Sequence, residues 1–251
     1  MNENKYISGV LFNDRLEKTS YLCKLPVVKY LAEKEHLTFS SDVTFFVGEN
    51  GTGKSTLLEA IAVAFGFNAE GGTKNFTFST RETHSQLFEC LTLQKKAHAK
   101  DGFFLRAESL YNVASNIDDM DSKPSLGPPV IQSYGGVSLH NQSHGESFLS
   151  IIQNRFSGNG LYIFDEPEAA LSPMRQLTLM LEIDRLIKNN SQLIIATHSP
   201  ILMAFPNAEI FEFSHSGIKK VNYRDTEHYK ITKQFLDNPE KMLHYLLREN
   251  N

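Results

Sequence analysis

The chain has 251 residues, 41% of them apolar and 22% charged, which is typical of a globular protein and excludes a disordered one. Its net charge of −4 excludes the strongly basic composition of many nucleic-acid-binding proteins, and two cysteines are too few for a disulfide framework or a cysteine-based metal site. Since no apolar run approaches the ~20 residues of a membrane helix and the N-terminus lacks a signal-peptide core, we expect a cytoplasmic protein of one large domain or two small ones.

Short strands and helices alternate in the first half of the chain. Residues with high β-propensity predict strands at 6–12, 43–47, 76–79 and 103–106. Helical spacing of apolar residues predicts helices at 27–32, 54–65 and 83–96, the last of them amphipathic. The stretch 117–136 is acidic and then rich in proline and glycine, which predicts a loop or the boundary of a mobile subdomain.

The alternation continues in the second half with longer helices. Strands are predicted at 161–165, 193–197 and 209–213, and helices at 145–156 and 174–188. The tail 226–248 is predicted to be helical and peripheral. Because short apolar strands that alternate with helices are typical of a parallel sheet covered on both faces, the predicted fold class is α/β.

A glycine-rich motif joins the predicted strand 43–47 to the predicted helix 54–65. Residues 48–55 read GENGTGKS and match G-x-x-x-x-G-K-S/T in the strand–loop–helix context that this motif requires. Backbone N–H groups of such a loop surround nucleotide phosphates, and the helix N-terminus adds a partial positive charge. We expect Lys54 to contact the β- and γ-phosphates and Ser55 to bind Mg²⁺. The nucleotide-binding residues predicted from the motif are Glu49, Asn50, Gly51, Thr52, Gly53, Lys54, Ser55 and Thr56.

Two carboxylates follow the predicted strand 161–165. If this strand lies next to the phosphate-loop strand, Asp165 reaches the Mg²⁺, usually through a water molecule. Glu166 follows at the exposed strand end, where it would polarise the water that attacks the γ-phosphate. The alternative is an acidic pair that merely starts the turn before Pro167, and the phosphate loop favours the catalytic interpretation.

Further polar groups are predicted near this edge of the sheet. His198 follows strand 193–197, and an imidazole N–H there would contact the γ-phosphate, unless it only caps the helix that follows. Ser143, Gly145 and Glu146 begin a predicted helix, and a hydroxyl with free N–H groups at a helix start suits a phosphate; an ordinary serine cap is the alternative. Residues 169–172 predict a contact loop.

These five segments, in this order, resemble the ATP-binding-cassette (ABC) ATPases: Walker A at 48–55, signature at 143–146, Walker B at 161–166, D-loop at 169–172 and a switch histidine at 198. The Ser-His-Gly-Glu signature is more similar to the heads of RecF, SMC and repair ATPases than to the Leu-Ser-Gly-Gly-Gln of transporters. Over its length the chain resembles small stand-alone bacterial ATPases of the AAA type.

The resemblance implies a P-loop NTPase fold, namely an ABC-type ATPase head with a mostly parallel central sheet flanked by helices, an N-terminal β region and a small helical insert. We expect a single domain over 1–251, with the helical and loop insert at about 84–142 and peripheral C-terminal helices at 226–251. The segment between Walker A and the signature lacks heptads and is too short for the long coiled coil of SMC heads.

The resemblance also implies a mechanism, with ATP and Mg²⁺ as cofactors and Glu166 and His198 as catalytic residues. In this family two cassettes face each other head to tail, so Ser143, Gly145 and Glu146 would contact the ATP held by the partner's Lys54. Since the chain contains one cassette, we expect a homodimer that hydrolysis releases.

Two further positions bear on the family pattern. The Q-loop glutamine is missing, and Glu108 occupies that slot, where it would contact Mg²⁺ or water; an ordinary polar residue at a helix start fits equally well. Arg81 lies where related heads carry an arginine near the nucleotide or DNA, and a surface arginine paired with Glu82 is the alternative.

Our leading hypothesis is a Mg²⁺-dependent ATPase whose ATP-driven dimerisation controls a partner protein or a nucleic acid, in DNA repair or phage defence. The first alternative is the nucleotide-binding subunit of a membrane transporter, against which the signature and the missing glutamine argue. The second is an ATP sensor with little turnover, against which the complete set of hydrolytic residues argues.

Neither DNA binding nor adenine recognition is settled by the sequence. Basic residues occur as the pairs Lys95–Lys96 and Lys219–Lys220, which are typical of solvated surface charge. Tyr21 and Tyr30 lie where an aromatic residue would stack on adenine, and a place in the core is the alternative for both.

Overall fold

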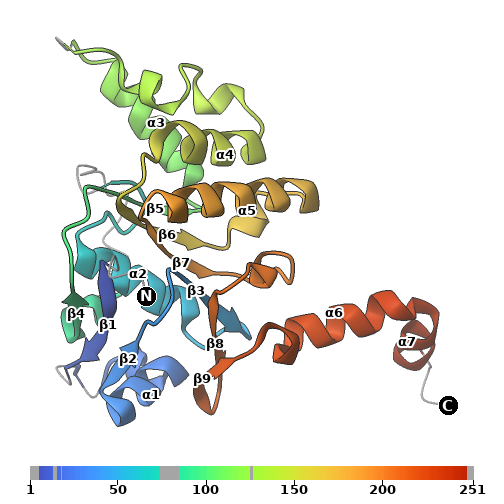
Figure 1. The fold of residues 1–251 in the computed structure, drawn as a ribbon. Coiled ribbons are helices and arrows are strands. Elements are labelled where there is room, and N and C mark those ends of the chain that lie inside the picture. The colour runs from blue at the N-terminus through green and yellow to red at the C-terminus, as the bar shows by residue number, and fades with distance from the viewer. Residues whose placement is uncertain (1–5, 14–15, 18, 74–84, 125–126, 248–251) are drawn as a thin grey trace.

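Two β-sheets form the centre of the protein in the computed structural model, which describes residues 6–13, 16–17, 19–73, 85–124 and 127–247 (Figure 1). The larger sheet has the order β5–β6–β7–β3–β8–β9, and every pairing in it is parallel except that of β8 with β9. Its strands are β3 (Val43–Gly48), β5 (Asp101–Arg106), β6 (Gly160–Asp165), β7 (Gln192–Ala196), β8 (Glu209–Ser214) and β9 (Gly217–Val221). The smaller, antiparallel sheet has the order β2–β1–β4, with β1 (Ile7–Phe12), β2 (His36–Thr38) and β4 (Leu91–Lys95).

Each face of the larger sheet has its own hydrophobic core. Successive side chains of a strand point to opposite faces, so Phe46 and Phe104 pack on one face while Phe45 and Phe103 pack on the other. The first face is covered by α1 (Pro26–Lys34), α2 (Lys54–Phe65) and the small sheet. The second is covered by α3 (Leu110–Asp121), α4 (His144–Arg155) and α5 (Pro173–Lys188). The predicted α/β fold with a mostly parallel sheet between helices is confirmed.

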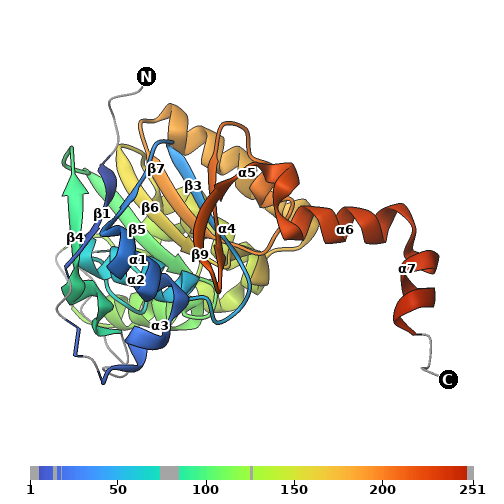
Figure 2. The same cartoon turned by 90° about the horizontal axis from the view of Figure 1, so that it is seen from below.

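The last two helices leave the body of the protein. Helices α6 (Glu227–Asp237) and α7 (Pro239–Leu246) form an arm that extends away from both sheets in Figures 1 and 2. The described part of the tail is therefore helical over most of its length, as the sequence predicts. Across the described residues, none of the helices combines the length and apolar character that a membrane crossing requires.

Two predictions of local structure were wrong. The amphipathic helix predicted at 83–96 is absent from its described part, 85–96, because Gln86–Cys90 is a 3₁₀ helix and Leu91–Lys95 is strand β4. Leu91 pairs with Phe12 and Leu93 with Val10 of β1, and this pairing with a distant strand overrides the local helical spacing. In 117–136, helix α3 continues to Asp121 and Val130–Tyr134 forms a 3₁₀ helix, so the loop is shorter than expected. The strand predicted at 76–79 lies outside the described residues.

The order of the strands corrects a third expectation. Strand β7 lies between β6, which carries Asp165, and the phosphate-loop strand β3, so these two strands are not neighbours. The domain ranges at 84–142 and 226–251 stay predictions. Within the first range, β5 belongs to the larger sheet and not to a separate insert.

Candidate nucleotide-binding and catalytic site

The phosphate loop runs from the end of β3 to the start of α2. Gly48 has φ +125°, and a Cβ there would lie 2.0 Å from the Phe213 carbonyl oxygen of β8, so this position requires glycine. Thr52 is buried, and its hydroxyl donates to the Glu49 carbonyl oxygen over 2.8 Å. Glu49, Asn50 and Gly51 are exposed at the tip of the loop, while Gly53 precedes α2 and Thr56 lies in its first turn. The loop therefore begins and ends on the rigid sheet and helix.

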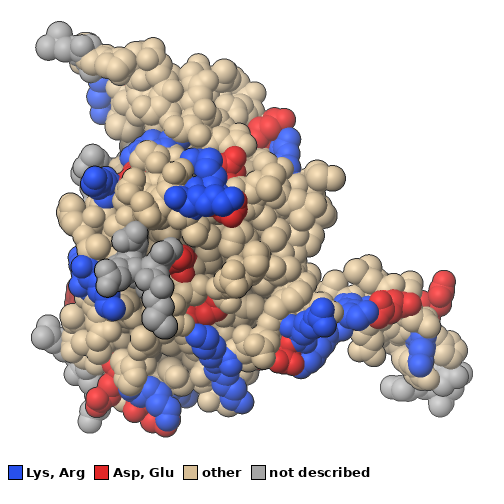
Figure 3. Space-filling view, viewed as in Figure 1, with Lys and Arg blue, Asp and Glu red and all other residues tan. Residues whose placement is uncertain are grey.

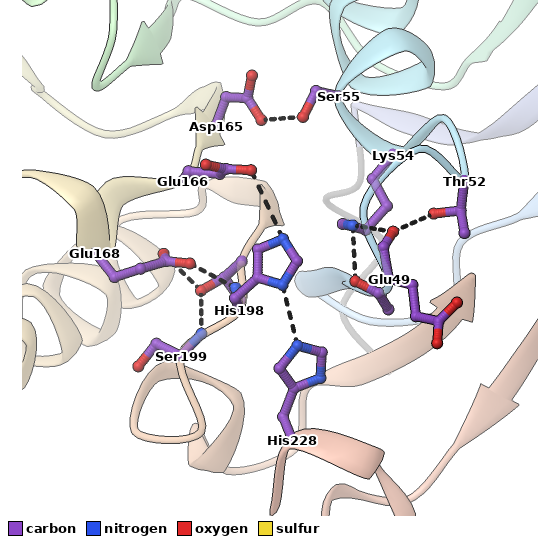
Figure 4. A network of polar contacts seen from close by, with 12 residues as sticks. Glu49, Thr52, Lys54, Ser55, Asp165, Glu166, Glu168, His198, Ser199 and His228 are labelled. Atoms are coloured by element: carbon purple, nitrogen blue, oxygen red, sulfur yellow. Dashed lines mark hydrogen bonds and ion pairs between the residues drawn. The ribbon is translucent and has the colours of Figure 1, made fainter. Parts of the chain in front are cut away.

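Lys54 is the first residue of α2 and is only 5% exposed. Its Nζ donates to the carbonyl oxygens of Gly48 (2.7 Å) and Glu49 (2.8 Å), so the ammonium group lies inside the loop (Figure 4). Burial lowers the pKa of Lys54, and the carboxylates of Glu166 and Asp165 oppose this shift. A buried cation beside a helix N-terminus is suited to an anion, and the nucleotide phosphates predicted from the motif fit this loop.

Ser55 and Asp165 come together although they lie on α2 and β6. The Ser55 hydroxyl donates to Asp165 Oδ1 over 2.9 Å. Burial raises the pKa of Asp165 to about 6, while the Arg106 guanidinium and the Ser55 hydroxyl lower it and the charges of Glu166 and Glu108 add to the increase. A hydroxyl and a carboxylate are the hard oxygen ligands that Mg²⁺ prefers. These two residues fit the expected ion, and Mg²⁺ would also relieve the cost of the buried carboxylate.

Replacing Asp165 with asparagine is expected to stabilise the metal-free fold at neutral pH, although it removes a candidate metal ligand. The folded-state pKa of about 6 lies above the usual aspartate value of 3.8, so the ionised carboxylate costs about 3 kcal/mol in the folded protein. The wild-type penalty is absent below the unfolded-state pKa, grows as the pH rises toward 6 and is complete above it. Denaturant unfolding in EDTA should therefore show the gain of Asp165→Asn at pH 8 and lose it near pH 4.

The exposed Asp119 of α3 provides the matched control. Asp119→Asn should leave the free energy of unfolding nearly unchanged at both pH values. An Asp165→Asn variant that is no more stable than the wild type at pH 8 would contradict the buried-charge account.

Glu166 follows Asp165 in an unusual backbone conformation. Its φ of 48° and ψ of 53° place it in the left-handed region, which costs a residue with a side chain roughly 1–3 kcal/mol. Its N–H donates to the Ala196 carbonyl oxygen over 3.0 Å, which ties it to the end of β7. The Glu166 carboxylate lies 3.7 Å from His198 Nε2 (Figure 4). The strained turn thus directs the carboxylate toward the histidine that follows the neighbouring strand.

Glu168 holds the segment that carries His198, a role that the sequence analysis did not assign. Its carboxylate accepts hydrogen bonds from the Thr197 hydroxyl (2.7 Å) and from the His198 backbone N–H. Burial raises the pKa of Glu168, and these two hydrogen bonds oppose the increase. The sequence shows the acidic pattern Asp-Glu-Pro-Glu. It does not show that Glu168, the last residue of this pattern, contacts Thr197 and His198 at the end of the distant strand β7.

His228 is the second residue that sequence reasoning missed. It lies in the first turn of α6, and its Nε2 is 3.0 Å from His198 Nδ1. His198 therefore lies between Glu166 on one side and His228 on the other (Figure 4). No local signal marks His228, because only the fold brings α6 to the end of β7.

Arg106 is the third missed residue, and it occupies the position next to the Walker B aspartate. It pairs with Asp165 in the parallel register of β5 and β6, and its Nε lies 3.4 Å from Asp165 Oδ2. Its Nη1 donates to Glu59 over 2.9 Å. Glu108 is 81% exposed and contacts Arg106 at 3.9 Å. A role for Glu108 as a metal ligand stays a prediction.

The signature segment is built at the N-terminus of α4. Glu146 accepts hydrogen bonds from the Ser143 N–H (3.0 Å) and hydroxyl (2.6 Å), and Arg175 of α5 contacts both residues. A Cβ on Gly145 would lie 2.7 Å from the Ala170 carbonyl oxygen, so the D-loop packs directly against the signature. Among the described residues, the side-chain hydrogen bonds and ion pairs of Ser143 and Glu146 go to each other and to Arg175, and none goes to the phosphate loop of the same chain. In the view of Figure 1, α4 lies beside α3, and α5 lies between α4 and α6.

The candidate residues for adenine and for DNA stay predictions. Tyr21 is 64% exposed, and Tyr30 packs against the core of the α2 face. Arg81 lies outside the described residues.

Comparisons with known proteins show which domains and proteins the chain is similar to. Two family descriptions match separate parts of the chain: AAA_23, an AAA domain, over residues 27–106, and AAA_21, an AAA domain described for a proposed AbiEii toxin of a type IV TA system, over residues 137–204. The chain is 23% identical over 229 residues to the tungstate uptake system ATP-binding protein TupC of Campylobacter jejuni. This match covers 81% of this chain and 67% of TupC. It is 26% identical over 134 residues to the retron Vc95 probable ATPase of Vibrio cholerae. This second match covers 47% of this chain and 25% of that protein.

Solved structures define the fold more fully. The chain is similar to a metal-chelate type ABC transporter in an inward-facing conformation (TM-score 0.52, 14% identity, 91% of this chain and 88% of that chain). It is also similar to MJ1267, an ATP-binding cassette of an ABC transporter (TM-score 0.51, 13% identity, 96% of this chain and 99% of that chain). The fold and the phosphate loop thus define a P-loop protein with the ABC ATPase fold. The two AAA-domain matches and the ABC ATPase fold support the resemblance to ABC-like ATPases of the AAA type that the sequence indicates.

Proposed function

We propose that this chain is a Mg²⁺-dependent ATPase whose ATP-bound form pairs head to tail with a second copy and thereby switches a partner protein or a nucleic acid between two states. The observation that best supports hydrolysis is the convergence of Lys54, the Ser55–Asp165 pair and the Glu166–His198 pair at one edge of the sheet. An ATP sensor with little turnover would need Lys54 and the Ser55–Asp165 pair to bind ATP, but it would not need the Glu166–His198 pair.

Each residue has a distinct part in the proposed reaction. Lys54 and the N–H groups of the loop bind the β- and γ-phosphates, and Ser55 and Asp165 hold Mg²⁺. The bound ion would neutralise charge on the transferred phosphoryl group. Glu166 accepts a proton from the attacking water, and His198 donates from Nε2 to the γ-phosphate.

The dimer is supported by the separation of the signature from the phosphate loop. Ser143 and Gly145 lie at a helix N-terminus, which suits a phosphate, yet Ser143 contacts Glu146 and Arg175 instead of any group around Lys54. A second copy arranged head to tail would bring its signature to this chain's ATP. ATP then shifts the equilibrium by binding the paired state more tightly than the single chain.

The proposed partner is a protein in a defence-related setting. The retron ATPase similarity and the AAA_21 match favour a defence-related setting. On the face shown in Figure 3, Lys and Arg form several separate groups with Asp or Glu beside many of them, and this pattern favours a protein partner over nucleic acid.

A second candidate function is the ATP-binding subunit of a membrane transporter. The observation that favours it is the similarity to TupC, whose name describes an uptake system. The Ser-His-Gly-Glu signature and the absence of a Q-loop glutamine count against it.

The dimer is tested by the molar mass of Glu166→Gln in solution, with and without ATP and Mg²⁺. Slow hydrolysis in this variant should allow an ATP-bound dimer to accumulate. Adding Ser143→Arg to the same background should abolish the dimer, because a bulky side chain would block the proposed phosphate-binding position at the start of α4. The control is Ser122→Arg in that background, an exposed serine at the end of α3, which should leave the dimer intact.

Two results would contradict this proposal. A Glu166→Gln variant that binds ATP and stays monomeric at high protein concentration would exclude the homodimer and favour a transporter or another partner chain. A dimer that tolerates Ser143→Arg as well as Ser122→Arg would show that the signature does not form the interface.

A further inference from the structure

His198 and His228 form a pair of half-buried imidazole rings beside the phosphate loop. Nδ1 of His198 lies 3.0 Å from Nε2 of His228, and the ring centroids are 5.2 Å apart. His198 Nε2 and His228 Nδ1 are buried and have no hydrogen-bond partner within the described part of the chain. The pair therefore has one internal hydrogen bond and two free nitrogens, one of which faces the catalytic side.

The hydrogen bond between the rings links their tautomers. A neutral imidazole has one N–H donor and one acceptor nitrogen. If His228 donates from Nε2, His198 Nδ1 is the acceptor and the remaining proton of His198 is on Nε2. In the opposite arrangement, His198 Nε2 would present a lone pair to the Glu166 carboxylate 3.7 Å away. Repulsion between that lone pair and the carboxylate favours donation from His228.

Burial is the main factor that favours the neutral form of both rings, and Lys54 adds to it. Burial lowers the pKa of His198, Lys54 lowers it further and Glu166 opposes the shift. Burial likewise lowers the pKa of His228, His198 and Lys54 lower it further, and Glu227 and Glu212 oppose the shift. Lower pKa values favour the neutral form of both rings, and in the neutral form the tautomer of one ring determines the tautomer of the other.

His228 is held firmly although it begins a projecting helix. Thr226 is fully buried, and its hydroxyl donates to the Tyr223 carbonyl oxygen over 2.8 Å and accepts from the Tyr229 N–H over 3.3 Å. The Glu227 N–H donates to Glu212 of β8 over 3.3 Å. The first turn of α6 is thus fixed to the sheet, while the rest of the arm extends away from it (Figure 2).

We propose that His228 is a positioning residue that donates to His198 Nδ1 and thereby keeps the N–H of His198 on Nε2, directed toward the γ-phosphate position. His228 acts through His198 and touches neither the nucleotide nor the water. This inference rests on the proposed ATPase activity for its kinetic consequence, but the hydrogen bond and the tautomer are properties of the protein without nucleotide.

The tautomer is measured by ¹⁵N NMR of the histidine side chains in the nucleotide-free protein at pH 8. The wild type should show His198 protonated at Nε2 and a scalar coupling across the hydrogen bond between the rings. His228→Ala should remove the coupling and increase the Nδ1–H form of His198. His228→Gln, whose amide N–H can take the place of the imidazole donor, should restore the Nε2–H form. Protonation of His198 at Nδ1 in the wild type would overturn the proposal.

The kinetic test is a double-mutant cycle of His198 and His228. His228→Ala should lower kcat for ATP roughly tenfold with less than about a twofold change in KM, and His228→Gln should recover most of the loss. In the His198→Ala background, His228→Ala should have no further effect, because its action requires the His198 ring. The exposed His244→Ala on α7 is the matched control and should behave as wild type.

The two measurements separate this inference from the proposed function. If the wild type has the expected tautomer and coupling but does not hydrolyse ATP, the ATPase proposal fails and the positioning role stands as a structural fact. If the wild type hydrolyses ATP and His228→Ala lowers kcat equally with and without His198, the positioning role is wrong and the ATPase proposal survives.

Discussion

Replacing Glu166 with glutamine should lower kcat for ATP hydrolysis by roughly 10²–10⁴-fold, the usual contribution of a general base. Glutamine keeps the size of the side chain and its left-handed backbone position, but it cannot accept the proton of the attacking water. The side chain at 166 still contacts His198, from which the wild-type carboxylate lies 3.7 Å, but it no longer carries a negative charge. Steady-state phosphate release measures the rate, and calorimetry with ATP should show a Kd within a few fold of the wild type.

The exposed Glu240 of α7 is the matched control, and Glu240→Gln should retain the wild-type rate. A Glu166→Gln variant that keeps more than about a tenth of the activity would assign the general base to another group, and Glu168 would be the first candidate. Loss of ATP binding in the same variant would instead indicate that Glu166 contributes to binding of ATP before the chemical step.

Replacing Lys54 with methionine should weaken ATP binding and lower kcat/KM by about 10²-fold or more, since it removes a preorganised cation from the phosphate loop. Methionine is also unbranched, and it places an apolar side chain near the carbonyl groups of Gly48 and Glu49 that Lys54 contacts in the wild type. The lysine pays a desolvation cost that lowers its pKa, so the variant also removes an unfavourable buried charge. We therefore expect binding to be lost while the thermal midpoint stays close to that of the wild type.

Lys219 of β9 is exposed and provides a control for the change in net charge. Lys219→Met should leave both binding and the thermal midpoint unchanged. If Lys54→Met binds ATP with the wild-type Kd, the loop does not hold the phosphates as proposed. If Lys54→Met unfolds at a much lower temperature, its lost activity says nothing about phosphate contact, and Lys54→Arg would then test the site.

The elements nearest the site were the easiest to predict from sequence, and the reason is local. A buried strand, a glycine turn and an amphipathic helix follow one another within 43–65, so each signal supports the next. The same holds for β6 and β7, which are continuous apolar runs because both faces of the sheet are covered. Strand β4 was mistaken for a helix because its partner, β1, is about eighty residues earlier in the chain.

The sequence by itself determined the fold class and the place of the glycine-rich loop, and it predicted the site residues Lys54, Ser55, Asp165 and Glu166, because glycines, a strand end and a helix start specify their positions within a few residues. The tertiary structure decided that β7 lies between β6 and β3, that Glu168 holds His198 and that His228 contacts its other side. Those contacts join segments at least thirty residues apart, and their geometry follows from strand order and helix packing, which local sequence patterns do not encode.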